Sequence, residues 1–197
     1  MKVCVVGCTG YLGSKISLIL KKNGHELIGI CRKFPNSNKQ FKKNFNKIIQ
    51  SEITDKNIVS TIIKLNPDAI VYTVSLNHID SEKNLENSIN VNYLPLLRLC
   101  NALRKSKKII KFIYFSTMQV YGNYSRIDKI TEKTPKAINN IYALTHSLCE
   151  DTLIEMNKNT FIESTSIRLS NGYGAPVLKT CDCWWLVVND FCMNSIK

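Results

Sequence analysis

The chain has 197 residues, which is enough for one well-buried domain and the start of a second. Its hydrophobic fraction of 44% and charged fraction of 21% are ordinary for a globular protein and exclude an intrinsically disordered chain. The sequence contains no secretion signal and no run of about 18 apolar residues, so we expect a cytoplasmic protein that does not span a membrane.

A formal net charge of +12 is compatible with a nucleic-acid partner. Segment 31–48 has no acid, and its basic side chains could follow a phosphate backbone: Arg32, Lys33, Lys39, Lys42, Lys43 and Lys47. No aromatic interleaving or DNA-reading motif accompanies them, and a lysine-rich composition explains them as solvated surface. We therefore expect no nucleic-acid partner.

The eight cysteines lie mostly inside apolar patterns, where a thiol packs as a small hydrophobe. Without a secretion signal, we expect them to be reduced. Cys181 and Cys183 form a close pair, but neither a second pair nor a histidine stands at zinc spacing. We expect no metal site.

The opening residues predict a strand, a tight turn and a helix in direct succession. An apolar run over residues 3–6 leads into Gly7, Gly10 and Gly13, and an amphipathic segment follows over residues 14–20. Gly7 permits the turn, Gly10 lets a phosphate approach the backbone, and Gly13 lets the helix pack closely on the strand. Because a helix N-terminus offers free N–H groups, this pattern predicts a site for the diphosphate of a dinucleotide.

Strands and helices alternate along the rest of the chain. The predicted strands cover residues 25–30, 47–49, 69–74, 111–116 and 161–169, and the predicted helices cover residues 55–65, 82–104 and 140–156. Pro95 is expected to kink the middle helix or shift its start, and residues 122–138 form a loop. The alternation predicts a doubly wound α/β domain, the Rossmann fold, with a parallel sheet covered on both faces.

The end of the second strand indicates which dinucleotide fits. In this fold an acidic residue there binds the adenosine ribose of NAD. This chain instead has Arg32, whose planar guanidinium suits a 2′-phosphate, so we favour NADP over NAD as the cofactor. Glu52 and Ile53 follow the third strand and are predicted to lie beside the adenine.

Further motifs, in a fixed order, carry a family resemblance. After the glycine turn come Asn90-Val91-Asn92, segment 115–122 (FSTMQVYG), segment 142–146 (YALTH) and segment 168–174 (RLSNGYG). This order resembles the extended short-chain dehydrogenase/reductase family. Within it, the chain is similar to the NAD-dependent epimerase/dehydratases, which act on nucleotide-linked sugars.

The resemblance, together with the glycine turn and the strand ends, implies roles for particular residues. Thr117 and Tyr142 stand at the catalytic threonine and tyrosine, and His146 stands where the family has a lysine. The implied cofactor-binding residues are Gly7, Thr9, Gly10, Tyr11, Leu12, Gly13, Arg32, Glu52, Ile53, Thr73, Val74, Ser75, Asn90, Tyr142, His146 and Ser170. Thr117 and Asn171 are implied to contact the substrate.

His146 departs from the family pattern Tyr-x-x-x-Lys, although the spacing keeps both side chains on one helix face. A lysine is charged at pH 7, whereas a histidine with an ordinary pKa of about 6.5 is mostly neutral there. His146 can replace the lysine's hydrogen bond to the nicotinamide ribose but supplies less of its electrostatic effect. Three outcomes stay open: activity shifted to lower pH or slower turnover, another charge in place of the lysine such as the oxidised nicotinamide, or lost catalysis with retained cofactor binding.

The resemblance implies an epimerase or a keto-sugar reductase in which Tyr142 is the general base and Thr117 assists it by a hydrogen bond. The similar dehydratases carry an Asp-Glu pair where this chain has Met118 and Gln119, so dehydration is not expected. The alternative is a dinucleotide-binding homologue without catalysis, either a sensor or a fragment.

We assign residues 1–174 to the dinucleotide-binding domain and residues 175–197 to the start of a substrate-binding region. Family chains continue well beyond this point. The apolar residues 184–188 are predicted to form one helix face. That face would pair with a second subunit, giving a homodimer, or with the rest of a longer protein.

Overall fold

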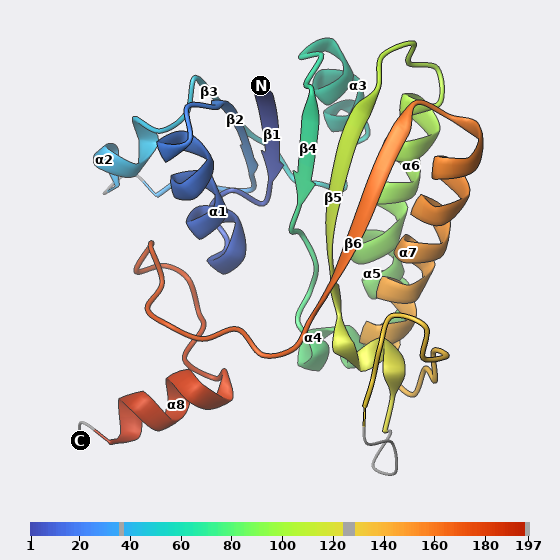
Figure 1. Cartoon of the computed structure of the whole chain (residues 1–197). Helices are drawn as coiled ribbons and strands as arrows, with labels where there is room; N and C mark the ends of the chain where they lie inside the picture. The colour runs from blue at the N-terminus through green and yellow to red at the C-terminus, as the bar shows by residue number, and fades with distance from the viewer. Residues whose placement is uncertain (36–37, 124–128, 196–197) are drawn as a thin grey trace.

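A computed structural model describes residues 1–35, 38–123 and 129–195 of the chain. Within these ranges, six parallel strands form one twisted sheet with helices on both faces (Figure 1). The strands are β1 (Lys2–Val6), β2 (Glu26–Cys31), β3 (Lys47–Gln50), β4 (Ala69–Tyr72), β5 (Ile110–Thr117) and β6 (Ile162–Leu169). Their order is β3-β2-β1-β4-β5-β6, which confirms the predicted Rossmann fold.

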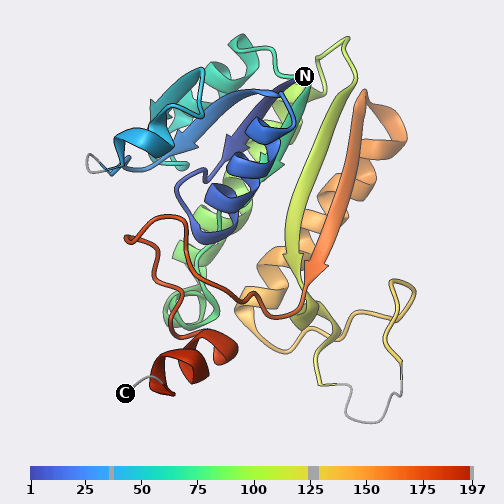
Figure 2. The same cartoon turned by 60° about the vertical axis from the view of Figure 1, so that its left-hand side comes forward.

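Two sets of helices cover the sheet (Figures 1 and 2). One face carries α3 (Lys56–Lys64), α6 (Leu94–Leu103) and α7 (Ile141–Asn159), and the other carries α1 (Tyr11–Lys22) and the short α2 (Lys39–Lys42). The remaining elements are α4 (His78–Lys83), α5 (Leu85–Ser88), a π-helix (Ile89–Tyr93), a 3₁₀ turn (Met118–Tyr121) and α8 (Val187–Asn194). No helix in the described ranges is long and apolar enough to cross a membrane.

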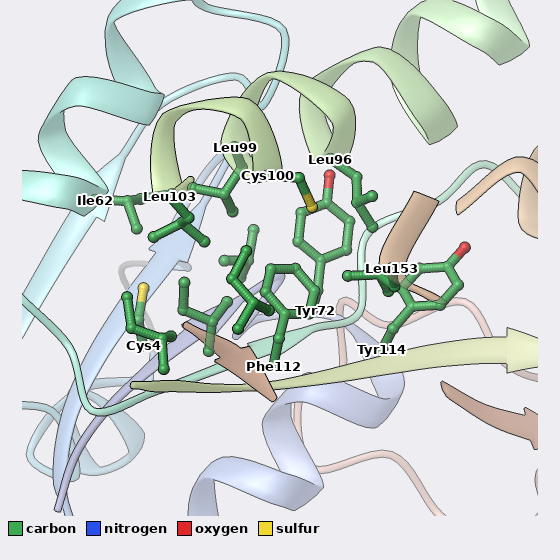
Figure 3. Packing of buried hydrophobic residues seen from close by; sticks show 14 of the residues in the cluster. Cys4, Ile62, Tyr72, Leu96, Leu99, Cys100, Leu103, Phe112, Tyr114 and Leu153 are labelled. Carbon is green, nitrogen blue, oxygen red and sulfur yellow. The ribbon is translucent and has the colours of Figure 1, made fainter. Parts of the chain in front are cut away.

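The side chains of β1 alternate between two apolar layers because successive residues of a strand point to opposite faces. Cys4 and Val6 join the layer under α3, α6 and α7, while Val3 and Val5 join the layer under α1. Figure 3 shows the first layer, in which the aromatic rings of the central strands meet the leucines of α6 and α7: Tyr72, Phe112 and Tyr114 against Leu96, Leu99, Leu103 and Leu153.

One part of the sheet is open, contrary to the expectation that helices cover both faces throughout. Glu163, Thr165 and Ile167 of β6 are exposed, and so is Lys111 of β5. In Figure 2, no helix lies over this face of β5 and β6. The α1 layer therefore stops short of the β6 edge, and β6 alternates half-buried with exposed side chains after the buried Ile162, as a half-covered strand does.

The predicted long helix over residues 82–104 is wrong in its bounds and continuity. Helical structure starts at His78, breaks at Asn84, whose backbone is extended, and passes through the π-helix before α6 begins. Pro95 accounts for the last change, since it has no N–H to donate and cannot continue a regular helix interior. The wider turn lets the N–H of Leu94 reach the carbonyl of Ile89 instead.

The C-terminal segment also differs from expectation. Its helix α8 begins at Val187, so Trp184 and Trp185 precede it and do not share a helix face with it. The backbone of Leu186 is extended, which sets the start of the helix. Residues 124–128 of the predicted loop 122–138, and residues 36–37 of the basic segment, lie outside the described residues.

Candidate functional site

The glycine turn between β1 and α1 is packed tightly against the loop after β4. Gly7 has a φ of +92°, and a Cβ added there would lie 2.5 Å from the Thr73 hydroxyl oxygen. A Cβ at Gly13 would collide with the carbonyl group of Gly7. The N–H of Gly10 donates to that same carbonyl at 2.9 Å. The turn therefore requires glycine at positions 7 and 13, one for the backbone conformation and one for the approach of α1.

Two adjoining cavities, of about 710 and 340 Å³, lie at the carboxyl ends of the strands. They meet where the chain order of the sheet reverses, between β1 and β4, which is where ligands bind in open α/β sheets. Both cavities are lined by residues of the glycine turn, the loop after β4 and the C-terminal segment: Gly10, Tyr11, Thr73, Ser75, Leu76, Asn77 and Asp182. Together they form one cleft.

The larger cavity contains most of the residues predicted to bind the cofactor: Gly7, Thr9, Gly10, Tyr11, Arg32, Glu52, Ile53, Thr73, Val74 and Ser75. Arg32 and Lys33 lie exposed at the end of β2, and Asp80 and Asp182 supply carboxylates elsewhere on the wall. The glycine turn, which carries no charged side chain over residues 7–13, therefore lies in the same cavity as the two cationic side chains Arg32 and Lys33.

The smaller cavity brings together the residues that the resemblance implies for catalysis. Thr117 ends β5, while Tyr142 and His146 lie one turn apart on α7. The rings of Tyr142 and His146 meet edge to face with centroids 4.4 Å apart. Leu12, Gly13, Ser170 and Asn171 line this same cavity.

His146 is 2% exposed and is held by β5. Its Nδ1 lies 2.6 Å from the hydroxyl oxygen of Tyr114, while its Nε2 is buried without a hydrogen-bond partner in the described structure. Burial lowers the pKa of His146 to about 4, against an opposing effect from Glu150. His146 is therefore neutral at pH 7, where the family lysine would carry a charge.

Tyr142 lies in an environment that favours the neutral phenol. Burial raises its pKa, and a hydrogen bond with the Ser75 side chain partly offsets that rise. A phenol that is to act as a base at neutral pH needs the opposite shift, which a nearby positive charge provides. The neutral His146 does not supply that charge.

A buried ion pair fixes the strand ends beside the site. Arg168 of β6 bonds both carboxylate oxygens of Glu150 at 2.9 and 2.7 Å, and Ser116 donates to the same carboxylate at 2.6 Å. Lys136 adds a third cation-to-carboxylate contact at 3.1 Å. Burial pushes the pKa of Glu150 upward, but these donors outweigh it and lower the pKa below its usual value. The pair ties α7 to β5 and β6, next to Thr117.

Two residues that sequence reasoning missed set the position of α7. Glu82 accepts from the backbone N–H groups of Ile141 and Tyr142 at 2.7 and 3.3 Å, placing a carboxylate at the helix N-terminus. Asn140 caps the same helix by accepting from the N–H of Ala143 at 2.7 Å. An asparagine just before an amphipathic run signals such a cap, whereas no sequence pattern connects Glu82 to residue 141.

Of the two asparagines in the π-helix, Asn92 makes the contacts beside the site. Neither it nor the predicted Asn90 lines either cavity, so a cofactor contact of Asn90 stays a prediction. Asn92 is buried, accepts from the N–H of Leu76 at 2.7 Å and donates to the Thr145 hydroxyl at 3.1 Å. Its side chain therefore connects the loop after β4 with α7. Asn92 lies four residues after the buried Ser88 and four before the buried Leu96, on the buried face of this stretch.

The C-terminal segment passes over the cleft. The Tyr11 hydroxyl donates to the carbonyl of Gly174 at 2.8 Å, and the Cys181 thiol donates to the carbonyl of Thr9 at 3.2 Å. Leu178 is fully buried against the α1 layer. Residues of this segment thus line both cavities. Residues 175–197 are predicted from the sequence to start a substrate-binding region, but none of them is named there as a site residue.

Comparison with known proteins places these features in a family. The model of the NAD dependent epimerase/dehydratase family matches residues 3–180. CDP-paratose 2-epimerase of Salmonella typhi is 23% identical over 100% of this chain and 64% of its own length. UDP-glucose 4-epimerase of Lactobacillus helveticus is 26% identical over 89% of this chain and 53% of its own length.

Solved structures agree on the fold. UDP-glucose 4-epimerase of Thermotoga maritima, with UDP-glucose, superposes with a TM-score of 0.84 at 21% identity, over 97% of this chain and 62% of that one. UDP-glucuronic acid 4-epimerase of Bacillus cereus, in complex with UDP-glucuronic acid and NAD, superposes with a TM-score of 0.82 at 20% identity. The match covers 100% of this chain and 63% of that one. The chain spans less than two thirds of the length of these relatives.

Proposed function

We propose, since the chain belongs to the NAD dependent epimerase/dehydratase family, that it is the dinucleotide-binding and reacting part of an NAD(P)-dependent enzyme that acts on a nucleotide-linked sugar. One observation carries the proposal. Thr117 and Tyr142 line a cavity that adjoins the cavity of the glycine turn, as an enzyme that brings a sugar to a dinucleotide requires.

The residues present fit a dinucleotide. The diphosphate would lie at Gly10, where the turn leaves the backbone open beside the N-terminus of α1. The unpartnered Nε2 of His146 offers a polar contact at the other end of the cleft. When bound, the nicotinamide supplies a hydride acceptor or donor.

The protein's own side chains would handle the proton. Tyr142 would accept it from a sugar hydroxyl, and Thr117 would hold that hydroxyl by a hydrogen bond. Met118 and Gln119, which follow Thr117, cannot transfer a proton, so we propose epimerisation or keto-sugar reduction and not dehydration.

A second candidate is a protein that binds the dinucleotide without turnover. The buried, neutral His146 favours it, because it supplies no positive charge to lower the pKa of the Tyr142 phenol, which burial raises. Replacing His146 with lysine distinguishes the two candidates. A large gain in rate supports a weakened enzyme, and inactivity of both forms supports a binding protein.

We further propose that NADP(H) binds more tightly than NAD(H), because Arg32 lies exposed on the wall of the larger cavity, where a 2′-phosphate can be paired. Solved relatives contain NAD, including UDP-glucose 4-epimerase of Thermus thermophilus. The division at residue 174 and self-association through residues 184–188 stay predictions.

The test replaces Tyr142 with phenylalanine and measures NADH binding by fluorescence, together with turnover of nucleotide-linked hexoses. Turnover should fall by roughly two orders of magnitude or more, because the general base is lost, while NADH affinity stays within a few-fold. Tyr173→Phe is the matched control, since this tyrosine is 73% exposed and lines neither cavity. Turnover that survives in Tyr142→Phe would show that another group is the base.

A further inference from the structure

Tyr114 and His146 form a buried pair behind the smaller cavity. Each is 2% exposed, their rings lie with centroids 5.7 Å apart, and the phenol oxygen lies 2.6 Å from Nδ1 of the imidazole. Tyr114 belongs to β5 and His146 to α7, so the contact joins the sheet to the helix that carries Tyr142. Figure 3 shows Tyr114 in the packed layer beside Tyr72, on the neighbouring strand.

The hydrogen of this short contact belongs to Tyr114. Burial raises the pKa of Tyr114 well above its ordinary value, so the hydroxyl keeps its proton. The other group within its reach is the thiol of Cys149, which itself donates to the carbonyl of Asn92 at 3.4 Å. Sulfur is a weak acceptor and an imidazole nitrogen a strong one, so the phenol donates to Nδ1.

A neutral imidazole with Nδ1 as acceptor carries its proton on Nε2. That nitrogen is buried without a partner among the described residues, and His146 lines the smaller cavity. We propose that Tyr114 is a positioning residue that holds His146 in this one tautomer, so that Nε2–H faces the ligand as an uncharged hydrogen-bond donor. The proposal rests on the proposed function for the identity of the ligand and on geometry for the tautomer.

The tautomer of His146 determines which ligand groups can bond to it in the smaller cavity. In the other neutral tautomer, Nε2 would carry a lone pair beside the protonated Tyr142 and would accept a hydrogen bond from a donor on the ligand. The Nε2–H tautomer suits an oxygen acceptor, such as a hydroxyl oxygen of a ribose or sugar. The groups around the imidazole that titrate or carry charge are Tyr142, Cys149 and Glu150 on α7 and Tyr114 on β5.

Nitrogen NMR of the ligand-free chain tests the tautomer without relying on activity. The protein is labelled with ¹⁵N-histidine, and His146→Gln identifies the signals of His146 among the three histidines. We expect Nε2 to be protonated and Nδ1 unprotonated in the wild type, and a mixed or reversed population in Tyr114→Phe. Tyr72→Phe is the matched control, because it removes a buried hydroxyl on the adjacent strand that bonds to none of the residues the structure describes.

A double-mutant cycle with NADH as the probe then tests the positioning role. Tyr114→Phe should weaken NADH binding roughly three- to tenfold, as expected for one misplaced hydrogen bond. In a His146→Lys background the same change should have no effect beyond twofold, because an ammonium has no tautomer to fix. A protonated Nδ1 in the wild type, an unchanged tautomer in Tyr114→Phe, or an equal loss in both backgrounds overturns the inference. A wild-type chain that binds no NADH contradicts the proposed function, while the NMR result still decides the tautomer.

Discussion

The two ends of the cleft are formed by different kinds of groups. The larger cavity is formed by backbone turns and exposed charged side chains, among them Gly7, Gly10 and Arg32. The smaller cavity depends on buried side chains that hold one another, with His146 between Tyr114 and Tyr142. The first kind of site depends on steric fit at a few backbone positions. The second depends on hydrogen bonds and on the protonation of groups removed from water.

The largest expected effect comes from acidifying the buried end. The folded pKa of His146 is about 4 and the unfolded value about 6.5, so folding disfavours protonation. Above about pH 6.5 His146 is neutral in both the folded and the unfolded chain and takes nothing from the free energy of unfolding. That free energy should fall by roughly 3 kcal/mol as the pH drops from about 6.5 to about 4, because only the unfolded chain binds the proton.

Urea unfolding of the wild type and His146→Gln at several pH values measures this loss. The variant should lose less stability over the same window. His25→Gln serves as the control, because His25 is only partly buried and lines neither cavity. Parallel curves for wild type and His146→Gln would mean that His146 is solvated in the folded state. Acidic residues such as Glu150, whose pKa is lowered in the folded state, also reduce the folding stability when they are protonated, but at lower pH and equally in the wild type and the variant.

The next largest effect is expected at the glycine turn, which lines the larger cavity. Gly13→Ala places a methyl group against the Gly7 carbonyl, which forces α1 away from β1. Dinucleotide affinity should fall by roughly 5- to 150-fold, since overpacking of this size costs about 1–3 kcal/mol. Fluorescence titration with NADH measures the loss.

Gly24→Ala is the matched control for that change. Gly24 has a φ of +77°, and an added Cβ would meet nothing within 4 Å, so the variant carries backbone strain of about 1 kcal/mol without a clash. It should melt at a lower temperature yet bind NADH as the wild type does. Equal binding losses in the two variants would trace the effect of Gly13→Ala to general destabilisation.

The smallest effect concerns the exposed charge. Arg32→Ala should lower NADPH affinity by about tenfold while leaving NADH affinity nearly unchanged, because only NADPH carries the 2′-phosphate. Lys39→Ala is a control of equal charge change, since Lys39 is exposed and lines neither cavity. Wild-type affinities that are equal for the two dinucleotides would remove the proposed preference for NADP.

The difference between the glycine turn and the buried side-chain contacts also explains how much of the site could be predicted from the sequence. The glycine spacing and the strand ends are local features, so Gly7, Gly13 and Arg32 could be placed correctly relative to the turn and β2. The motif order predicted that Thr117 and Tyr142 lie close together, and both line the smaller cavity, while their catalytic roles stay predictions.

The contacts behind the reacting residues could not be predicted, because they join residues distant in the chain. Tyr114 meets His146 only because β5 packs under α7 in one particular register, and Glu82 reaches Ile141 only because α4 ends beside α7. Asn84 and Pro95 were visible in the sequence, yet neither says whether a helix kinks, stops or widens. The structure shows a stop at the first and a widened turn before the second.

The widened turn over Ile89–Tyr93 has a consequence for how this chain can vary. A π turn holds one residue more than a regular turn, and each residue advances an α-helix by about 100°. Each residue of the wider turn therefore advances the chain by less than that angle, and the extra residue makes up the difference. Deleting one residue there would restore regular winding with almost no net rotation of α5 relative to α6, so the leucines of α6 would keep their place in the sheet-facing layer. The residues inside the turn would shift, Asn92 among them, and its bonds to Leu76 and Thr145 would be lost. A one-residue deletion should therefore disturb the contacts made by this stretch itself and leave the packing of the helices on either side intact.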